Sequence, residues 1–327
     1  MIRRLAIATL ALVVSSGCTE RRSASSVESV TFDVAMLPHF SLVLVAQAKG
    51  YFQQEGLAVT LRPYAFGQVA LSAMLQGPAE LATCAETPVV LAELRGERLS
   101  VLARISRSTR TMAVIARKDR GISGPPDLAG KRVGVTLGTS GHFFLDTFML
   151  RHAIDGRKVH LVDLKPDAMA GAIERGEVDA VATWAPTTLA LQKRFGEKVE
   201  AFYVEDLYSE MGVLVARRGF AQRRPEVAKR VLRALFRAEA LFTEQPEEAR
   251  RVVAAVLVDD AEFLDATLRQ FQFRIRLGQS LLEEMEEEGA WARRMGLATV
   301  NPAPDLLDAL EPAPLLAVRP DAVGLVR

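Results

Sequence analysis

The sequence predicts an α/β fold in which mainly parallel strands alternate with helices and form two lobes. Near-continuous apolar stretches, typical of strands buried on both faces, recur between helical stretches that end at glycine. Ser, Thr or Pro residues stand where the helices begin, as capping chemistry favours. Two similar apolar segments, residues 111–117 and 211–217, bracket a region with strand–helix units of its own. We expect these two segments to be the strands by which the chain crosses between the lobes.

The N-terminus has the pattern of a signal peptide over residues 1–17. Arg3 and Arg4 precede the apolar run LAIATLALVV, which is shorter than the about 20 residues that a membrane-spanning helix needs. The following Ser-Ser-Gly-Cys resembles the lipobox of bacterial lipoproteins, although Ser15 stands where leucine is commonest. That resemblance implies a lipid on Cys18 and a polar tether over residues 18–30. The alternative is an ordinary secretory signal in which Cys18 is incidental.

The first lobe is expected over residues 31–111 and 217–300. Three strand–helix units open it, and each strand ends at a junction rich in Phe, Ser, Thr or Pro. The expected strands are 30–37, 57–65 and 80–85, and the helices that follow them are 42–52, 68–77 and 89–96.

The second lobe is expected over residues 112–216. A Gly/Pro-rich turn opens it at residues 121–130. Strand 131–137 runs into the sequence GTSG and then a helix, and strand 178–184 runs into helix 187–196.

The rest of the chain is expected to be mostly helical. Residues 225–242 carry apolar side chains at helical spacing. The acidic run 283–288 is most simply a solvated helix face, and residues 301–327 form a Pro-rich C-terminal wrap.

Composition and motifs exclude several classes of function. With 327 residues, 49% hydrophobic residues and a net charge of +1, the chain has the profile of a globular protein without the basic surface that nucleic acid requires. The sequence GTSGHF lacks the G-x-S-x-G spacing of a hydrolase nucleophile, and His142 stands on the same turn as Ser140. The four histidines show no metal-binding spacing, so we expect no metal and no cofactor.

The candidate binding residues lie at the strand–helix junctions, because ligands of open α/β sheets bind outside the carboxyl ends of the strands. At residues 138–141, glycines and helix N–H groups favour a carboxylate, sulfonate or phosphate, with Thr139 and Ser140 adding hydroxyl donors. The alternative is that these hydroxyls only cap their own helix. Glu86, after strand 80–85, would pair with an amine or ring N–H of a ligand, or else interact with its own helix N-terminus.

Other junction residues can also be interpreted either as ligand-binding or as purely structural. Trp184 and Phe40 can form walls of a site or belong to the core, and His142 can donate to an anion or face water. Glu210 precedes the second crossing strand and is therefore expected near the cleft.

The order of five stretches resembles the solute-binding proteins of ABC importers in the nitrate/sulfonate/taurine and thiamine-pyrimidine-precursor group. These stretches are AQAKGYFQQEGLAVTL, AETPVVLAELRGERL, DLAGKRVGVTLGTSGHFFLD, GAIERGEVDAVATWAP and NPAPDLLDALEPAPLLAVRPDAV. The resemblance implies a two-lobed periplasmic-binding-protein fold of type II, with two crossover strands and a ligand cleft between the lobes. Carried over by position, it implies a ligand shell of Phe40, Ser41, Glu86, Thr87, Thr139, Ser140, His142 and Trp184.

By this resemblance the protein would be a monomer in the periplasm or at the cell surface, anchored to the membrane by lipid on Cys18. It would capture its solute by hinge closure and deliver it to the permease and ATPase of the importer. The class of solute is expected from the residues instead: Glu86 would repel an anion, and an acid opposite the helix N-terminus at residues 138–141 favours a small polar solute that is zwitterionic or nitrogen-heterocyclic. Two alternatives stay open. One is a sensory ligand-binding module for a membrane receptor, and the other is an enzyme on the same fold, like the relative that makes the thiamine pyrimidine.

Overall fold

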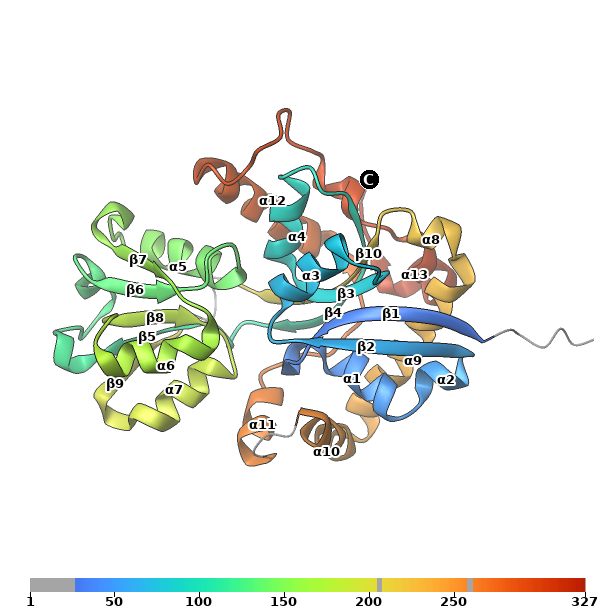
Figure 1. Ribbon diagram of the computed structural model, residues 1–327, viewed down its shortest axis with the longest axis horizontal. Helices are drawn as coiled ribbons and strands as arrows, with labels where there is room; N and C mark the ends of the chain where they lie inside the picture. The colour runs from blue at the N-terminus through green and yellow to red at the C-terminus, as the bar shows by residue number, and fades with distance from the viewer. Residues whose placement is uncertain (1–26, 205–207, 258–260, 327) are drawn as a thin grey trace, which may run out of the picture.

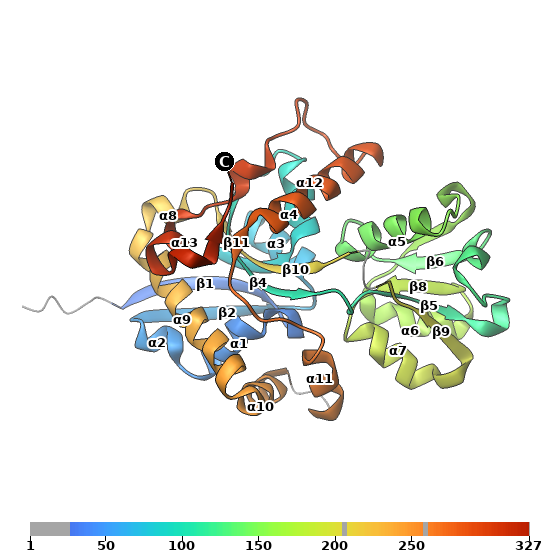
Figure 2. The same cartoon turned by 180° about the vertical axis from the view of Figure 1, so that it is seen from behind.

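The computed structural model describes residues 27–204, 208–257 and 261–326, and contains two five-stranded sheets that lie side by side (Figures 1 and 2). Helices cover both faces of each sheet. The expected signal peptide, Cys18 and most of the tether lie outside the described residues. Among the described helices, none combines the length and the hydropathy needed to cross a membrane.

The first sheet has the strand order β2-β1-β3-β10-β4, in which β10 runs antiparallel to its neighbours. Strand β3 is apolar because helices cover it on both sides, and its first four residues are fully buried. The first sheet and the helices between its strands comprise β1 (Glu28–Ala35), α1 (Ser41–Ala48), α2 (Tyr51–Gln54), β2 (Leu57–Tyr64), α3 (Gly67–Gln76), β3 (Leu81–Ala85), α4 (Glu86–Glu93), β4 (Leu99–Ser108) and β10 (Glu210–Arg217).

The second sheet has the order β7-β6-β8-β5-β9, and here β5 is the antiparallel inner strand. Its elements are β5 (Ala113–Arg117), β6 (Arg132–Val135), α5 (Ser140–Arg151), β7 (His160–Asp163), α6 (Pro166–Arg175), β8 (Ala180–Thr183), α7 (Thr187–Phe195) and β9 (Val199–Phe202). In both sheets the antiparallel strand is the first one after the chain has arrived from the other sheet. The predicted α/β fold with two crossover strands is confirmed.

The C-terminal third of the chain packs on the first sheet. Helix α9 lies against α1, α2 and α13, and β12 pairs with β11 (Figure 2). The elements are α8 (Phe220–Arg223), α9 (Pro225–Glu244), α10 (Pro246–Leu257), α11 (Ala261–Leu268), β11 (Leu277–Gly278), α12 (Gln279–Arg294), α13 (Ala313–Val318) and β12 (Val323–Gly324).

Three expected boundaries or surfaces need correction. Strand β1 begins at Glu28, inside the expected tether, because residues 28–30 already pair with β2. Strand β10 was expected within lobe 2 (112–216), but its backbone pairs with β3 and β4 of the first sheet. The acidic run on α12 is not one solvated face, since Glu288 is fully buried.

Candidate functional site

A small cavity lies where the two sheets meet, and residues from both sheets line it. Its volume is about 20 Å³, which is room for about one water molecule. The lining residues are Leu37, His39, Phe40, Phe66, Gly67, Gln68, Ala85, Pro88, Thr139, Ser140, Trp184 and Glu210.

The cavity lies at the carboxyl ends of the parallel strands, as the rule for open α/β sheets predicts. Helices α3 and α5 begin at its wall, and, among the described residues, no side chain caps either N-terminus. The leading N–H groups and the helix dipoles therefore favour a negative group in the cavity. Gly67 allows the start of α3 to pack closely on β3, because a Cβ there would lie 2.6 Å from the Cα of Cys84.

Glu210 provides the one carboxylate of the lining, and donors from three separate segments bind it. Nε2 of His39 lies 2.9 Å from Oε2, and the Thr111 hydroxyl donates to the same oxygen at 2.8 Å. The Ser140 hydroxyl donates to Oε1 at 3.2 Å. Burial alone would raise the pKa of Glu210, but these contacts together hold that pKa below its usual value. The carboxylate is therefore ionised at neutral pH.

His39 leaves one nitrogen unused in this arrangement. Its side chain is buried, and within the described part of the chain Nδ1 has no hydrogen-bond partner. A buried polar atom without a partner is rare in folded proteins.

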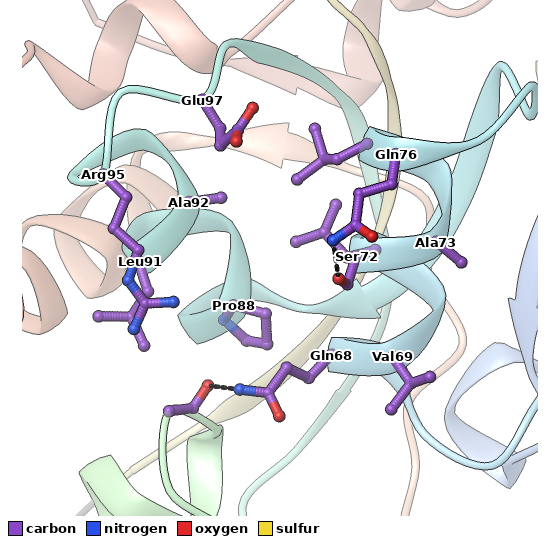
Figure 3. Close-up of a pocket in the computed structure, with 13 residues that line it drawn as sticks. Gln68, Val69, Ser72, Ala73, Gln76, Pro88, Leu91, Ala92, Arg95 and Glu97 are labelled. Atoms are coloured by element: carbon purple, nitrogen blue, oxygen red, sulfur yellow. Dashed lines mark hydrogen bonds between the residues drawn. The ribbon is translucent and has the colours of Figure 1, made fainter.

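The two sheets also touch directly beside the cavity. Nε2 of Gln68, on α3, donates to the carbonyl oxygen of Gly138 at 2.9 Å (Figure 3). The same nitrogen donates to the carbonyl oxygen of Leu137 at 3.2 Å. Gly138 has φ of +72°, and a Cβ there would meet the Gln68 amide at 2.8 Å. The structure is accordingly that of a closed form, in which side chains of the two sheets fill the space between them.

Two larger grooves adjoin the cavity. One, of about 590 Å³, lies between α3 and α4 and shares Gln68 and Pro88 with the cavity (Figure 3). The other, of about 660 Å³, shares Leu37 and Phe66 with it and is bounded by α6, α7 and α11. Both grooves open to solvent.

Five of the nine residues predicted for the site line the cavity: Phe40, Thr139, Ser140, Trp184 and Glu210. The alternative in which Thr139 or Ser140 caps α5 is wrong, because the Thr139 hydroxyl donates to the Thr136 carbonyl and that of Ser140 to Glu210. The other four predicted residues, Ser41, Glu86, Thr87 and His142, lie outside the lining.

Ser41 and Glu86 both make contacts away from the cavity. The Ser41 hydroxyl donates to the carbonyl of Pro38 at 2.6 Å and stabilises its own turn. Glu86 is fully buried behind the cavity, where Oε1 accepts from the Tyr208 hydroxyl at 2.5 Å and Oε2 from the Met211 N–H at 3.0 Å. Both carboxyl oxygens are thus used by segments distant in sequence.

Thr87 belongs to the same buried group, since its hydroxyl donates to the carboxyl of Glu288 on α12. Burial, reinforced by Glu284, raises the pKa of Glu86 well above its usual range. Burial, reinforced by Glu86, does the same for the pKa of Glu288. Glu86 and Glu288 are therefore largely protonated at neutral pH and provide no negative charge to the cavity.

His142 lies beside the cavity and not in its wall. Its ring is 5.1 Å from that of Trp291 on α12, and Nδ1 accepts from the Gly138 N–H at 3.4 Å. Phe143 packs on the same indole, with ring centres 5.4 Å apart. Helix α5 of the second sheet therefore rests on α12, which packs on the first.

Sequence reasoning missed the contribution of His39 and of the junction after β2. Phe66, Gly67 and Gln68 follow a strand as Thr139 and Ser140 do, so the junction rule contained the signal for them. No comparable signal marks His39, whose role depends on Glu210, far along the chain. Among the described residues, no three acidic, His or Cys side chains are arranged to hold a metal ion.

Comparison with known proteins is consistent with this geometry. The family model described as NMT1/THI5 like matches residues 37–249. The chain is 27% identical to the taurine-binding periplasmic protein of Escherichia coli over 222 residues, which are 67% of this chain and 69% of that protein.

Solved structures show the same fold. The periplasmic aliphatic sulphonate binding protein SsuA from Escherichia coli superimposes with a TM-score of 0.74 at 18% identity, covering 86% of this chain and 97% of that one. The desulfurization enzyme DszB gives a TM-score of 0.72 at 18% identity, with 90% and 99% covered. Both binding proteins and an enzyme thus share this architecture.

Proposed function

This chain belongs to the NMT1/THI5-like family, and from that premise we propose that it is the solute-binding protein of an ABC importer. The observation that carries the proposal is the cavity at the meeting of the two sheets. Its lining comes from the junctions of both sheets and from Glu210, at the start of the strand that returns the chain to the first sheet.

The mechanism is hinge closure between two lobes. One lobe is the first sheet with the C-terminal helices, and the other is the second sheet with α5, α6 and α7. A solute bound to one lobe is enclosed when the other closes over it, and the closed form docks on the permease. Since the enclosed space holds about one water, a bound solute keeps the lobes further apart than they are here.

The solute we propose is a small zwitterion. A carboxylate has about four acceptor sites, and three of those on Glu210 are taken, which leaves one on Oε1 for a ligand amine. The uncapped N-termini of α3 and α5 suit the acidic group of the same molecule. Trp184 and Phe40 suit its apolar part. Taurine, named for the similar Escherichia coli protein, is an amine joined to a sulfonate and fits this class.

Location and partners are part of the same proposal. The pattern of residues 1–18 supports export and a lipid anchor at Cys18, and the taurine-binding relative is a periplasmic protein. We propose that the protein acts as a monomer and delivers its solute to the permease and ATPase.

Catalysis on this fold is the rival function, because DszB is an enzyme. The cavity supports binding instead. The Ser140 hydroxyl donates its proton to a carboxylate that is already held by His39 and Thr111, so it is not arranged as a nucleophile beside a free base.

The test is a thermal-stability screen of the protein without its signal peptide against aminosulfonates, amino acids, pyrimidines, simple sulfonates and nitrate. A ligand at 100 times its Kd stabilises the native state by about 2.7 kcal/mol, a shift of a few degrees in Tm. Glu210→Gln is expected to weaken the binding of zwitterions, measured as the Tm shift, more than the binding of simple sulfonates. Glu286→Gln, an exposed acid on α12, is the matched control.

Three outcomes would change the assignment. Hits confined to pyrimidines would show that the solute is a nitrogen heterocycle and not a zwitterion. No hit in the screen would favour a sensory or other protein-binding role. Product formation from any hit would establish an enzyme.

A further inference from the structure

A second polar cavity lies in the first lobe, away from the junctions of the strands and helices. It has a volume of about 240 Å³ and shares no lining residue with the cavity between the sheets. Its walls are the edge strand β4, the segment that pairs with it, the start of α12 and the turn before β12. The lining residues are Arg104, Arg276, Gly278, Ser280, Leu281, Asp321, Ala322 and Gly324.

Two arginines face one another in this cavity. Arg104 and Arg276 form an antiparallel bridge, with N–H to carbonyl distances of 2.7 and 3.0 Å in the two directions. Like charges directly opposite one another on paired strands destabilise the pair. Burial, together with Arg107 and Arg276, lowers the pKa of Arg104 to about 10, so the Arg104 guanidinium is still cationic at neutral pH. Among the described residues, Nε of Arg104 is buried without a hydrogen-bond partner.

Helix α12 adds its N-terminus to the same wall. The helix runs for 16 residues, begins after Gly278 and has no acidic residue in its first turn. Within the described chain no side chain caps it, so its leading N–H groups are free for another acceptor. The partial positive charge of this helix end adds to that of the two guanidinium groups.

The nearby acids do not balance this charge. Asp321 lines the cavity, but its exposed carboxylate is 4.0 Å from Nη1 of Arg276. Glu239 accepts the Ile275 N–H at 2.7 Å, and its other oxygen lies 3.7 Å from both Arg274 and Arg319. Two further charged groups lie nearby: Arg107, whose guanidinium donates to Ser209, and Glu284, which interacts electrostatically with Arg107.

We infer that the cavity between Arg104, Arg276 and the start of α12 binds a tetrahedral oxyanion, a phosphate or sulfate group. Arginine forks bind such groups through two parallel hydrogen bonds each, and a helix N-terminus supplies backbone donors from a third direction. A multi-oxygen anion can accept from all three at once. It would also remove the repulsion between the facing arginines.

The first experiment is a thermal-stability titration with inorganic phosphate in buffer free of phosphate and sulfate, with chloride at equal ionic strength. We expect Tm of the wild type to rise by a few degrees with phosphate and not with chloride. Arg276→Gln and Arg104→Gln should lose that rise. In the absence of phosphate, Arg276→Gln should be no less stable than the wild type, because it removes a like-charge pair.

Two control variants separate this site from other sources of the response. Arg157→Gln replaces an arginine whose side chain is 91% exposed, and it should respond as the wild type does. Ser140→Ala alters the proposed solute site and should also respond fully. A response lost in Ser140→Ala but kept in Arg276→Gln would place the anion in the cleft and overturn the inference.

A flotation assay with phosphatidylglycerol vesicles identifies the source of the group. Binding of free phosphate that Arg276→Gln abolishes supports a soluble anion. Vesicle binding that Arg276→Gln abolishes, without a response to free phosphate, supports a lipid headgroup. If both arginine variants match the wild type with phosphate and with vesicles, the inference is wrong.

Discussion

Glu284→Gln is the prediction whose sign and size follow most directly from the structure. Glu284 lies half-buried on α12, one turn before Glu288. Burial raises the pKa of Glu284 to about 7, with a further contribution from Glu287 and an opposing one from Arg107. The native state therefore holds a proton on this carboxyl at a pH where the unfolded chain does not.

The pKa difference fixes the direction of the pH dependence. For a carboxyl whose native pKa is raised, the stabilisation is fully present below the unfolded pKa and is lost as pH rises through the native pKa. Between about 4.5 and about 7 the loss amounts to at most about 3.4 kcal/mol, at 1.36 kcal/mol per pKa unit. Because solvent reaches part of the side chain, we expect about 1–3 kcal/mol.

The assay is guanidinium unfolding of the wild type and of Glu284→Gln at pH 5 and pH 8. The glutamine cannot ionise, so the variant should exceed the wild type in stability only slightly at pH 5 and clearly at pH 8. Glu286→Gln, on the exposed face of the same helix, should change neither value by more than about 0.5 kcal/mol. Equal stabilities of wild type and Glu284→Gln at pH 8 would refute the reasoning.

Three further predictions concern the closed form. Glu210→Gln should lower the free energy of unfolding at pH 7 by about 2–4 kcal/mol in denaturant titrations, because it disturbs three buried hydrogen bonds to a charged group. Gln68→Ala removes a direct bond between the lobes and should increase the radius of gyration in small-angle scattering, whereas an unchanged radius would show that this bond does not hold the lobes together. Burial lowers the pKa of His142, so its stabilising contribution is present above about 6.5 and declines as pH falls; His142→Phe should flatten the decline of Tm between pH 7 and pH 5.

Much of the fold could be predicted because its strands are apolar and end at recognisable junctions. Strand β4 was missed, since LSVLARISRS carries two arginines and a polar end that do not read as a buried strand. Those arginines are tolerated because β4 is the edge strand of the first sheet, where their side chains reach solvent or the cavity at α12. The similarity of residues 111–117 to 211–217 marked the crossings correctly but could not say which sheet each strand joins.

One rule led to several of the residues that line the cavity. Thr139, Ser140 and Trp184 line the cavity because a junction after a parallel strand points to the meeting of the sheets. The same rule failed for Glu86, whose partners Tyr208 and Met211 arrive from a part of the chain that local sequence does not bring near. Tertiary partners decide whether a junction side chain faces a ligand or the core.

Glu86 and Glu210 make this point testable, because both are buried acids beside the same cavity and their surroundings act in opposite directions. Burial, reinforced by Glu284, raises the pKa of Glu86, and the hydrogen bond from the Tyr208 hydroxyl does not offset this rise. His39, Thr111 and Ser140 instead lower the pKa of Glu210 despite equal burial.

Only Glu210 can therefore present a negative charge to a solute. Glu86→Gln should leave the ranking of zwitterions over simple sulfonates unchanged, while Glu210→Gln should reverse or abolish it, as measured by Tm shifts across the same solutes. A change in ranking with Glu86→Gln and none with Glu210→Gln would mean that the acid facing the solute is Glu86, and that the closed arrangement of these side chains is not the one that binds.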